Sequence, residues 1–263
     1  MVGFRLITGE RINDYHMEKT NEIFQSTIRF SFGNEELSAG LALFSSVSDE
    51  EFYVKTHMLL HPEELKTGAG YASAIRRRSF LNGRMAGKLA INQVFPAIPS
   101  AACRIKIGAI GEPVLCDLPQ PYGVSISHND EWNAGLCFPL IVPMGIDVET
   151  ITEKNRDIIA SILSPSEKNL CAVEDDPLEL FHLLWTAKEA AGKAIGLGFR
   201  VPAAWYEIVS VETLSKEPQL IRRCRFAQLS VYTALSVKIP GGMLSIAFPA
   251  ENNLSQTMIG LLQ

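Results

Sequence analysis

The chain has 263 residues, a formal net charge of −5 and 47% hydrophobic residues, with five cysteines. This length suits one large domain or two smaller ones, and the acidic balance disfavours nucleic-acid binding. An odd number of cysteines without a Cys-x-x-Cys pair argues against a disulfide framework or a zinc ribbon and favours a reducing compartment. We find no secretory signal pattern and no apolar run of about 18 residues, so we expect a cytoplasmic protein without a membrane span.

The first half mixes strand and helix patterns. Two strands with β-branched and aromatic content are separated by the turn signal Gly33-Asn34. A capping box at Ser48-Asp49-Glu50-Glu51 predicts the start of a helix, and a long helical pattern ends before Pro96. The strands are predicted at 21–33, 39–47, 103–109 and 123–127, and the long helix at 72–94. An apolar segment, 134–142, ends at Pro143.

A domain boundary near Pro143 divides the chain into 1–143 and 144–263. In the second part a strand begins at Gly145, and Ser164 starts another capping box with Pro165 at the first helical position. A helix that opens at Asp176-Pro177 runs to Ile195, before a glycine-rich cap. The remaining prediction is three closing strands, 205–214, 228–239 and 243–248, and a loose tail from Asn252. The class is α+β, without a clear sequence repeat.

Basic residues lie on the predicted helix at 72–94. Arg77, Arg84 and Lys88 fall within about 40° of one another at 100° per residue, and Leu81 lies in the same sector. Burying a cation is costly without a partner, so cations on the apolar side of a helix indicate an anion site. The alternative is a solvated helix face, which is the usual role of a run of charges.

Two acidic residues share one face of the strand that begins at Gly145. Side chains alternate along a strand, so Asp147 and Glu149 point the same way and repel each other unless a cation separates them. Mg²⁺ uses one or two carboxylates, keeps several waters and takes other ligands from substrate phosphates. An exposed edge strand with solvated acids is the alternative.

The helix that ends near Ile195 adds a third acid. Trp185, Glu189 and Lys193 follow one another at four-residue spacing and form a stripe. Glu189 is a candidate third metal ligand and Lys193 a candidate phosphate contact, whereas the alternative is a surface ion pair between them. We interpret Trp185 as a packing residue. Upstream, Ser127 and His128 end a strand and have side chains that suit hydrogen bonds to a phosphate.

Three of these segments together resemble a known family. Their order and spacing are similar to the signature of 4′-phosphopantetheinyl transferases, and the length and basic helix resemble the larger surfactin-synthetase-activating type. The segments are Ser125-Ile126-Ser127-His128, Gly145-Ile146-Asp147-Val148-Glu149 and Trp185-Thr186-x-Lys188-Glu189-Ala190-x-x-Lys193-x-x-Gly196-x-Gly198.

The resemblance implies a fold, a reaction and a set of site residues. The implied fold has two similar α+β halves in a pseudo-two-fold arrangement, with coenzyme A and Mg²⁺ in the cleft between them. The implied reaction transfers phosphopantetheine from coenzyme A to a serine of an apo acyl or peptidyl carrier protein, releasing 3′,5′-ADP. By likeness, the metal ligands are Asp147, Glu149 and Glu189, and the coenzyme A contacts are Arg77, Arg84, Ser127, His128 and Lys193.

Several expectations depend on this resemblance. Glu189 is the candidate base for the serine proton, directly or through a metal-bound water, and two internal halves suit a monomer. The alternatives are another Mg²⁺-dependent phosphotransferase and a catalytically silent module that binds coenzyme A or a carrier. One departure is Gly111-Glu112-Pro113, where the family often has a lysine between the glycine and the proline. Either Glu112 turns outward, or the Arg76–Arg84 cluster compensates for its charge.

Overall fold

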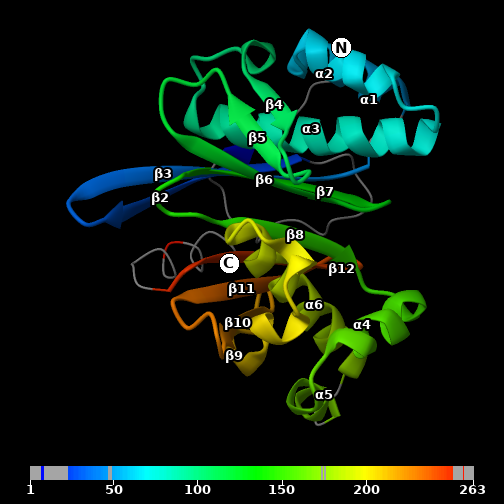
Figure 1. Ribbon diagram of the computed structural model, residues 1–263, viewed down its shortest axis with the longest axis vertical. Coiled ribbons are helices and arrows are strands. Elements are labelled where there is room, and N and C mark those ends of the chain that lie inside the picture. The colour runs from blue at the N-terminus through cyan, green and yellow to red at the C-terminus, as the bar shows by residue number, and fades with distance from the viewer. Residues whose placement is uncertain are drawn as a thin grey trace. The chain divides into compact units, whose positions relative to one another are not determined.

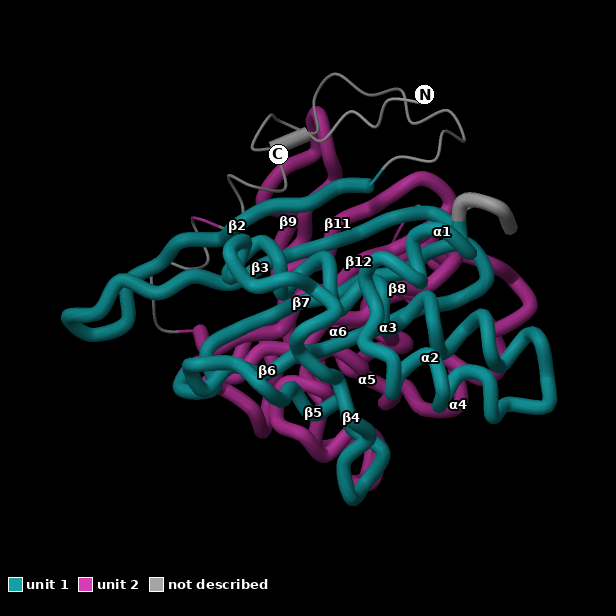
Figure 2. Tube along the Cα trace, turned by 90° about the horizontal axis from the view of Figure 1, so that it is seen from above, with its two compact units in different colours: residues 1–141 teal, residues 142–263 magenta. Residues whose placement is uncertain are grey.

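The computed structural model describes residues 7–8, 23–46, 49–172, 174, 176–250 and 257. It divides into two compact units, Met1–Ile141 and Val142–Gln263 (Figure 2). Each unit is a sheet packed against helices, so the predicted α+β class with two similar halves is confirmed. Residues 21–22, the capping residue Ser48 and nearly all of the predicted tail lie outside the described residues.

Unit 1 contains a five-stranded sheet in the order β1-β2-β3-β7-β6, antiparallel except where β1 pairs with β2. Its strands are β1 (Ile7–Thr8), β2 (Ile23–Phe32), β3 (Glu35–Ser45), β6 (Tyr122–His128) and β7 (Trp132–Pro139). A separate ribbon pairs β4 (Arg104–Ile107) with β5 (Pro113–Cys116). The helices are α1 (Asp49–Leu59), α2 (Pro62–Ala69), α3 (Ala74–Val94) and the short η2 (Ser100–Ala102).

Unit 2 contains a five-stranded antiparallel sheet in the order β8-β12-β11-β10-β9. Its strands are β8 (Gly145–Thr150), β9 (Ile208–Ser215), β10 (Ile221–Phe226), β11 (Tyr232–Ile239) and β12 (Gly242–Pro249). Its helices are η3 (Glu153–Asn155), α4 (Arg156–Ile162), α5 (Pro165–Ala172), α6 (Pro177–Ala194), η4 (Gly198–Arg200) and η5 (Ala203–Tyr206). No helix within the described ranges combines the length and apolar content needed to cross a lipid bilayer.

Side-chain caps fix where the helices begin. Asp176 Oδ1 accepts from the backbone N–H of Glu179, and Pro177 occupies the first turn of α6. The capping box predicted at Ser164 is present, because Ser164 Oγ accepts from the Glu167 N–H while the Glu167 carboxylate accepts from the Ser164 N–H. The missed helix α2 begins with a similar capping box at His61. Serine and aspartate caps are readable from sequence, whereas a histidine cap is not a usual signal.

One long helix packs closely on each sheet: α3 on β3, β6 and β7, and α6 on β8, β11 and β12 (Figure 1). Glycine permits this approach, since a Cβ added to Gly40 of β3 would lie 2.0 Å from the Ala90 carbonyl oxygen of α3. A Cβ added to Gly145 of β8 would likewise lie 2.0 Å from the Ala190 carbonyl oxygen of α6. The two helices therefore meet their sheets at corresponding places.

A buried ion pair is repeated in the two units, although the sequence showed no clear repeat. In unit 1 the Lys88 ammonium lies 3.0 Å from Glu64, and in unit 2 the Lys188 ammonium lies 2.7 Å from Glu167. Each glutamate also accepts a hydrogen bond of 2.8 Å from a strand N–H, that of Ile105 or Ile208. Each stands in a Leu-x-Pro-x-Glu segment, Leu60–Glu64 or Leu163–Glu167.

This repeat relates the three acids selected from the sequence to positions in unit 1. If Gly145 corresponds to Gly40 and Lys188 to Lys88, then Asp147 and Glu149 correspond to Ala42 and Phe44, and Glu189 to Leu89. Ala42 and Phe44 are buried apolar residues of unit 1. Asp147 and Glu149 of unit 2 thus stand at positions where unit 1 has apolar core residues. A purely structural role does not explain acids at such positions.

The remaining strand predictions differ in part from the structure. The predicted strand 228–239 begins only at Tyr232, and residues 205–206 belong to η5 instead of a strand. Strand β10, Ile221-Arg222-Arg223-Cys224-Arg225-Phe226, was missed. Its three arginines conceal the strand pattern, but two of them pair with acids: Arg222 with Glu174 and Arg223 with Glu212.

Candidate functional site

Strand β8 positions Asp147 and Glu149. It is the outer strand of its sheet and pairs only with β12 among the described strands, opposite Ser245 at Asp147 and Met243 at Glu149. Asp147 is nevertheless only 3% exposed, and Glu149 is half-buried. A solvated acidic edge therefore does not describe Asp147, because α6 packs on this strand.

Lys193 joins α6 to β8. Its ammonium donates to Asp147 Oδ1 at 2.7 Å, and its side chain is 27% exposed. The sequence left open a surface ion pair between Glu189 and Lys193. The close ion pair of Lys193 is instead with Asp147. The lysine instead offsets one of three carboxylates gathered at this place.

The other two carboxylates are electrostatically coupled to Asp147. Burial, followed by repulsion from Asp147, raises the pKa of Glu149 to about 7, and Glu189 adds a smaller repulsion. The same two causes raise the pKa of Glu189 to about 7, while Lys193 opposes the increase. These repulsions show that the fold places the three acids selected from the sequence close to one another. A group of repelling carboxylates indicates a site suited to additional positive charge.

Trp185 contributes more than the packing role predicted for it. Its indole Nε1 donates to Glu149 Oε1 at 3.4 Å and lowers the pKa of that carboxyl against the larger effect of burial. The ring also stacks on Phe199, with centroids 5.2 Å apart and an interplanar angle of 13°. Phe199 in turn meets Tyr206 edge-on. An aromatic row therefore connects the loop after α6 to one of the acids.

Lys188 does not belong to this group, although it stands next to Glu189 in the motif. Its side chain is 1% exposed and its ammonium pairs with the fully buried Glu167. Lys88, counted in the basic sector of α3, is likewise fully buried and paired with Glu64. Their positions on the apolar faces of helices are explained by buried glutamate partners that lie far away in the sequence.

The donor set of the acidic group fits Mg²⁺. Asp147, Glu149 and Glu189 offer carboxylate oxygens, which Mg²⁺ prefers, and their mutual repulsion would be relieved by a cation. Within the described ranges no cluster of three or more His, Cys, Asp or Glu side chains is arranged as a ready-made metal cage.

In unit 1, strand β6 ends at Ser127 and His128. Ser127 is 7% exposed, whereas the imidazole of His128 is exposed and its Nδ1 lies 3.3 Å from Ser79 Oγ of α3. The helix comes this close because residue 83 is glycine, where an added Cβ would lie 2.9 Å from His128 Cδ2. The sequence did not select Ser79, since a serine within a helix carries no distinctive signal.

The two arginines assigned to coenzyme A have different surroundings. Arg77 is exposed and donates to the Tyr71 carbonyl oxygen at 3.1 Å. Arg84 is 8% exposed, and its guanidinium carbon lies 4.7 Å from the centroid of the Phe80 ring. At 100° per residue, Arg84 lies about 100° round α3 from Gly83, which faces His128. Arg76, seven residues before Gly83, shares the Gly83 side to within about 20°.

Glu112 forms bonds within its own loop. Its Oε2 accepts from the Ile110 N–H at 2.9 Å, and its carbonyl oxygen accepts from the Gly108 N–H at 2.8 Å. A Cβ added to Gly108 would lie 2.2 Å from the Glu112 carboxylate. The acid that replaces the usual lysine therefore has a local structural role that occupies its carboxylate.

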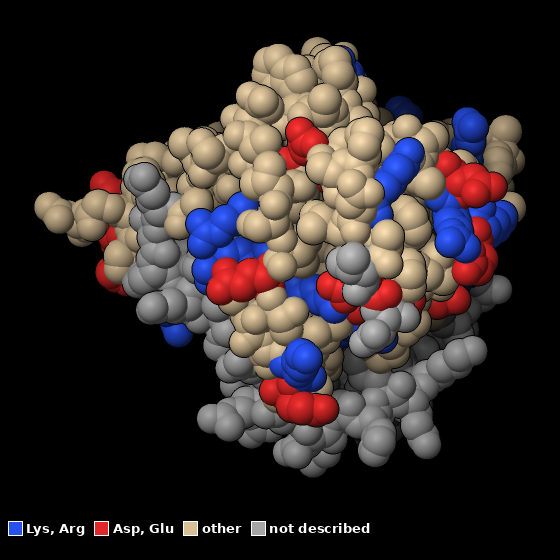
Figure 3. Space-filling view, turned by 90° about the horizontal axis from the view of Figure 1, so that it is seen from below, with Lys and Arg blue, Asp and Glu red and all other residues tan. Residues whose placement is uncertain are grey.

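Acidic and basic side chains are interspersed on the face of the molecule in Figure 3, where red and blue groups lie side by side. Such mixing agrees with the small net charge of −5. No extended surface of one charge is seen among the described residues on this face.

The sequence of unit 2 matches a family model. Residues 143–247 match the 4′-phosphopantetheinyl transferase superfamily, and this range includes Asp147, Glu149, Glu189 and Lys193.

Curated relatives are similar at low identity. The chain is 32% identical over 106 residues to 4′-phosphopantetheinyl transferase gsp of Aneurinibacillus migulanus, covering 37% of this chain and 44% of the relative. It is 31% identical over 94 residues to 4′-phosphopantetheinyl transferase Sfp of Bacillus subtilis (strain 168), covering 35% and 41%. The matches thus span less than half the length of these two relatives.

Two holo-carrier synthases are also similar. A holo-[acyl-carrier-protein] synthase of Geobacter sulfurreducens is 29% identical over 104 residues, covering 37% of this chain and 82% of the relative. Among solved structures, a holo-(acyl-carrier-protein) synthase from Bacillus anthracis str. Ames in complex with CoA (3′,5′-ADP) has a TM-score of 0.34 and 20% identity. That likeness covers 38% of this chain and 91% of the solved chain.

Proposed function

Residues 143–247 of this chain belong to the 4′-phosphopantetheinyl transferase superfamily, and we propose that the protein transfers the 4′-phosphopantetheine arm of coenzyme A to a carrier-protein serine. The products are the holo-carrier and 3′,5′-ADP. The observation that carries this proposal is the coupling of three carboxylates, Asp147, Glu149 and Glu189, beside Lys193 in the matched region.

The three carboxylates are the proposed ligands of Mg²⁺. When bound, the metal would supply positive charge to the pyrophosphate of coenzyme A, where negative charge increases during phosphoryl transfer. Asp147 is held in place by Lys193, and Glu149 by Trp185. These contacts restrict the carboxylates before a ligand arrives and so reduce the ordering that binding requires.

Lys193 is the proposed phosphate contact of unit 2. Its ammonium is paired with Asp147 and partly exposed, so it can donate to a phosphate oxygen with its remaining N–H groups. Ser127, His128 and Arg77 of unit 1 are the proposed contacts for the 3′-phosphate. Ser79 and Arg76 join them as candidates, because Ser79 contacts His128 and Arg76 shares its side of α3.

Glu189 is the proposed base for the serine hydroxyl of the carrier. Without the metal, burial and Asp147 raise the pKa of Glu189 to about 7, and a bound Mg²⁺ would lower that pKa and keep the carboxylate ionised, as a proton acceptor must be. The carboxylate would accept the serine proton, directly or through a water, as the serine oxygen attacks the β-phosphorus of coenzyme A. The bond between the β-phosphorus and the bridging oxygen of the pyrophosphate then breaks, and 3′,5′-ADP leaves with that oxygen on its 5′-phosphate.

The proposal is tested by the mass of a carrier protein. Purified protein, Mg²⁺, coenzyme A and apo carriers of fatty-acid, polyketide and nonribosomal-peptide origin are incubated, and intact masses are measured. We expect a gain of one phosphopantetheine on at least one carrier, and a loss of at least about a hundredfold in rate for Asp147→Asn. Glu212→Gln, which neutralises an exposed acid of β9, is the matched control and should keep the rate.

Two alternatives have distinct outcomes in the same assay. Transfer of a different phosphorylated group with the same acids would leave every carrier mass unchanged, yet consume another phosphorylated substrate in a manner that Asp147→Asn abolishes. A silent coenzyme A or carrier-binding module would show no turnover, and Asp147→Asn would change nothing. Either result would contradict the proposed transfer.

A further inference from the structure

Unit 1 contains a cavity beside the buried face of α3. It has a volume of about 290 Å³ and lies between α2, α3 and β4. Its lining includes Arg84 and Phe80 of α3, Glu63 and Glu64 of α2, and Arg104 and Lys106 of β4. Ser127 and His128 are not among the residues that line it. The cavity is therefore separate from the place where β6 meets Ser79.

Arg84 is the unusual residue of this cavity. It is more than nine-tenths buried, and its buried Nε has no hydrogen-bond partner in the described part of the chain. Its guanidinium carbon lies over the Phe80 ring, a contact that uses none of the guanidinium N–H groups as hydrogen-bond donors. An unpaired buried donor of a charged group is costly, so it calls for a partner.

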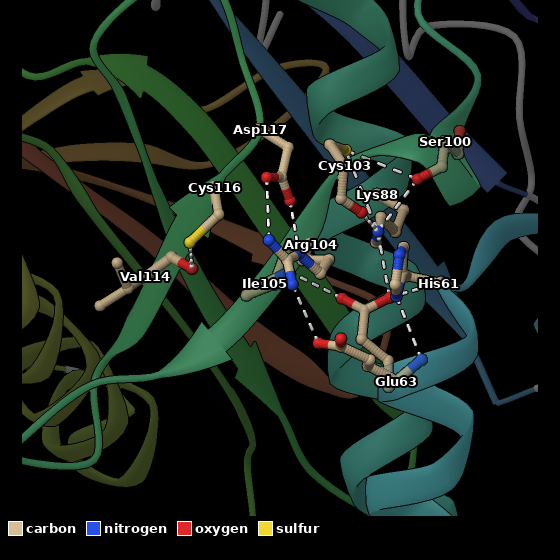
Figure 4. A network of polar contacts seen from close by, with 11 residues as sticks. His61, Glu63, Lys88, Ser100, Cys103, Arg104, Ile105, Val114, Cys116 and Asp117 are labelled. Atoms are coloured by element: carbon tan, nitrogen blue, oxygen red, sulfur yellow. Dashed lines mark hydrogen bonds and ion pairs between the residues drawn. The ribbon is translucent and has the colours of Figure 1, made fainter.

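The acids of the cavity are already engaged elsewhere. Glu64 pairs with Lys88 and accepts backbone N–H bonds from His61 and Ile105. Figure 4 shows Arg104 between Glu63 and Asp117, and it pairs with them at 3.1 and 2.6 Å. These bonds use the carboxylates without satisfying Arg84.

The charged side chains that line the cavity have a net charge of one positive unit. Three cations, Arg84, Arg104 and Lys106, face two carboxylates, Glu63 and Glu64. Burial lowers the pKa of Arg84, against the attraction of Glu64, but an arginine stays charged near neutral pH. A singly charged oxyanion would balance the excess.

At the corresponding position, unit 2 has an apolar side chain in place of this arginine. With Lys188 corresponding to Lys88, Arg84 corresponds to Leu184, and Phe80 to Leu180. Both leucines are buried in the core of unit 2. Replacing a buried charge by a well-packed apolar side chain is often neutral or stabilising. The presence of Arg84 is therefore better explained by a ligand than by stability.

We propose that this cavity binds a small oxyanion, a carboxylate or phosphate group, on the edge of the Arg84 guanidinium, with Lys106 at its rim. A planar guanidinium can donate two parallel hydrogen bonds to either group. The site lies wholly in unit 1 and is independent of the proposed transfer. The resemblance assigned Arg84 to the 3′-phosphate of coenzyme A; its burial in a cavity that neither Ser127 nor His128 lines favours a separate anion.

The experiment observes the Arg84 Nε–H signal in the nitrogen-15 spectrum of the full chain. The signal is identified by its absence in both Arg84→Leu and Arg84→Lys, so that one variant suffices if the other fails to fold. Inorganic phosphate and acetate are titrated separately at constant ionic strength, with chloride as the reference. A saturable shift with phosphate, acetate or both supports the site and tells which oxyanion class it takes.

Two controls make the result specific. Lys106→Met should weaken binding at least threefold, whereas Arg29→Met, which removes an exposed cation of β2 outside the cavity, should leave it unchanged. The titration is repeated with saturating 3′,5′-ADP, and persistence of the shift supports a separate site. No shift beyond that with chloride would overturn the proposal, and so would loss of the shift in 3′,5′-ADP. Neither outcome depends on carrier modification.

Discussion

The ammonium of Lys193 lies 2.7 Å from Asp147 Oδ1 and ties the last turn of α6 to strand β8. This lysine neutralises one member of a group of three repelling carboxylates. It is also the proposed contact for a phosphate of coenzyme A. Removing it should therefore have opposite effects on the metal and on the reaction.

We expect Lys193→Met to bind Mg²⁺ several-fold more tightly in the absence of coenzyme A, because the acids lose their resident cation. The same variant should transfer phosphopantetheine at least about tenfold more slowly, because a phosphate contact is missing. Calorimetric titration of Mg²⁺ and the carrier mass assay measure the two effects. Weaker Mg²⁺ binding in Lys193→Met would show that the lysine supports the metal site instead of competing with it.

Trp185 is expected to lower the pKa of Glu149 and thereby to favour Mg²⁺ binding at neutral pH. Its N–H lowers the pKa of that carboxyl, so Trp185→Phe should raise the pKa above about 7 while keeping an aromatic ring against Phe199. A proton then competes with Mg²⁺, and we expect weaker Mg²⁺ binding at about pH 7 with recovery near pH 8.5. Trp205→Phe, at a half-exposed tryptophan of η5, is the matched control. A loss in Trp185→Phe that is equal at the two pH values would point to packing instead.

Removing one partner of the buried pair Glu167–Lys188 is expected to destabilise unit 2 more than the pairing itself stabilises it. Lys188→Met leaves a fully buried carboxylate without its cation and should cost about 3–5 kcal/mol in the free energy of unfolding. Glu167→Gln combined with Lys188→Met should cost less than the sum of the two single changes. Urea unfolding measures these values, and strict additivity would contradict the pairing. Arg156→Met, in an exposed pair with Glu153, should cost less than about 1 kcal/mol.

His182 gives the fold a defined response to acid. The imidazole is fully buried in α6; its Nε2 accepts from the Thr152 N–H at 3.3 Å, and its Nδ1 lies 2.9 Å from the Leu178 carbonyl oxygen. Burial holds its pKa below the usual value. The unfolded chain therefore binds this proton first, and stability is lost as the pH falls below about 6.5.

His182→Gln should flatten that part of the pH dependence, since glutamine cannot take up a proton. The free energy of unfolding is measured by urea titration between about pH 7.5 and pH 5. His57→Gln, at an exposed histidine of α1, is the control. An unchanged slope in His182→Gln would rule out this histidine as the source.

Local patterns were enough to predict much of unit 2. The alternation of β8 put Asp147 and Glu149 on one face, and helical spacing put Glu189 and Lys193 on one stripe. The electrostatic coupling of the three acids agrees with that reading. Ser164 and Asp176 signalled helix starts because each carries its own cap in the adjacent sequence. Such features depend on residues only a few positions apart.

Long-range partners were not predictable in the same way. Lys188 lies next to Glu189 in the motif, but it pairs with Glu167, and nothing in a single sequence connects two positions on different helices. The repeated pair in unit 1 was missed for the same reason. Strand β10 was concealed by arginines that find acids on other segments. The role of Trp185 depends on an indole N–H directed at Glu149, which spacing alone does not show.

The most direct test of the proposed metal site locates the ion itself. Crystals of the full chain grown with coenzyme A are soaked in Mn²⁺, which substitutes for Mg²⁺, and the anomalous diffraction signal of Mn²⁺ is measured. We predict one peak within about 2.5 Å of carboxylate oxygens from Asp147, Glu149 and Glu189, absent in crystals of Asp147→Asn. A peak bound by other residues, or none at a Mn²⁺ concentration that supports turnover, would contradict the account.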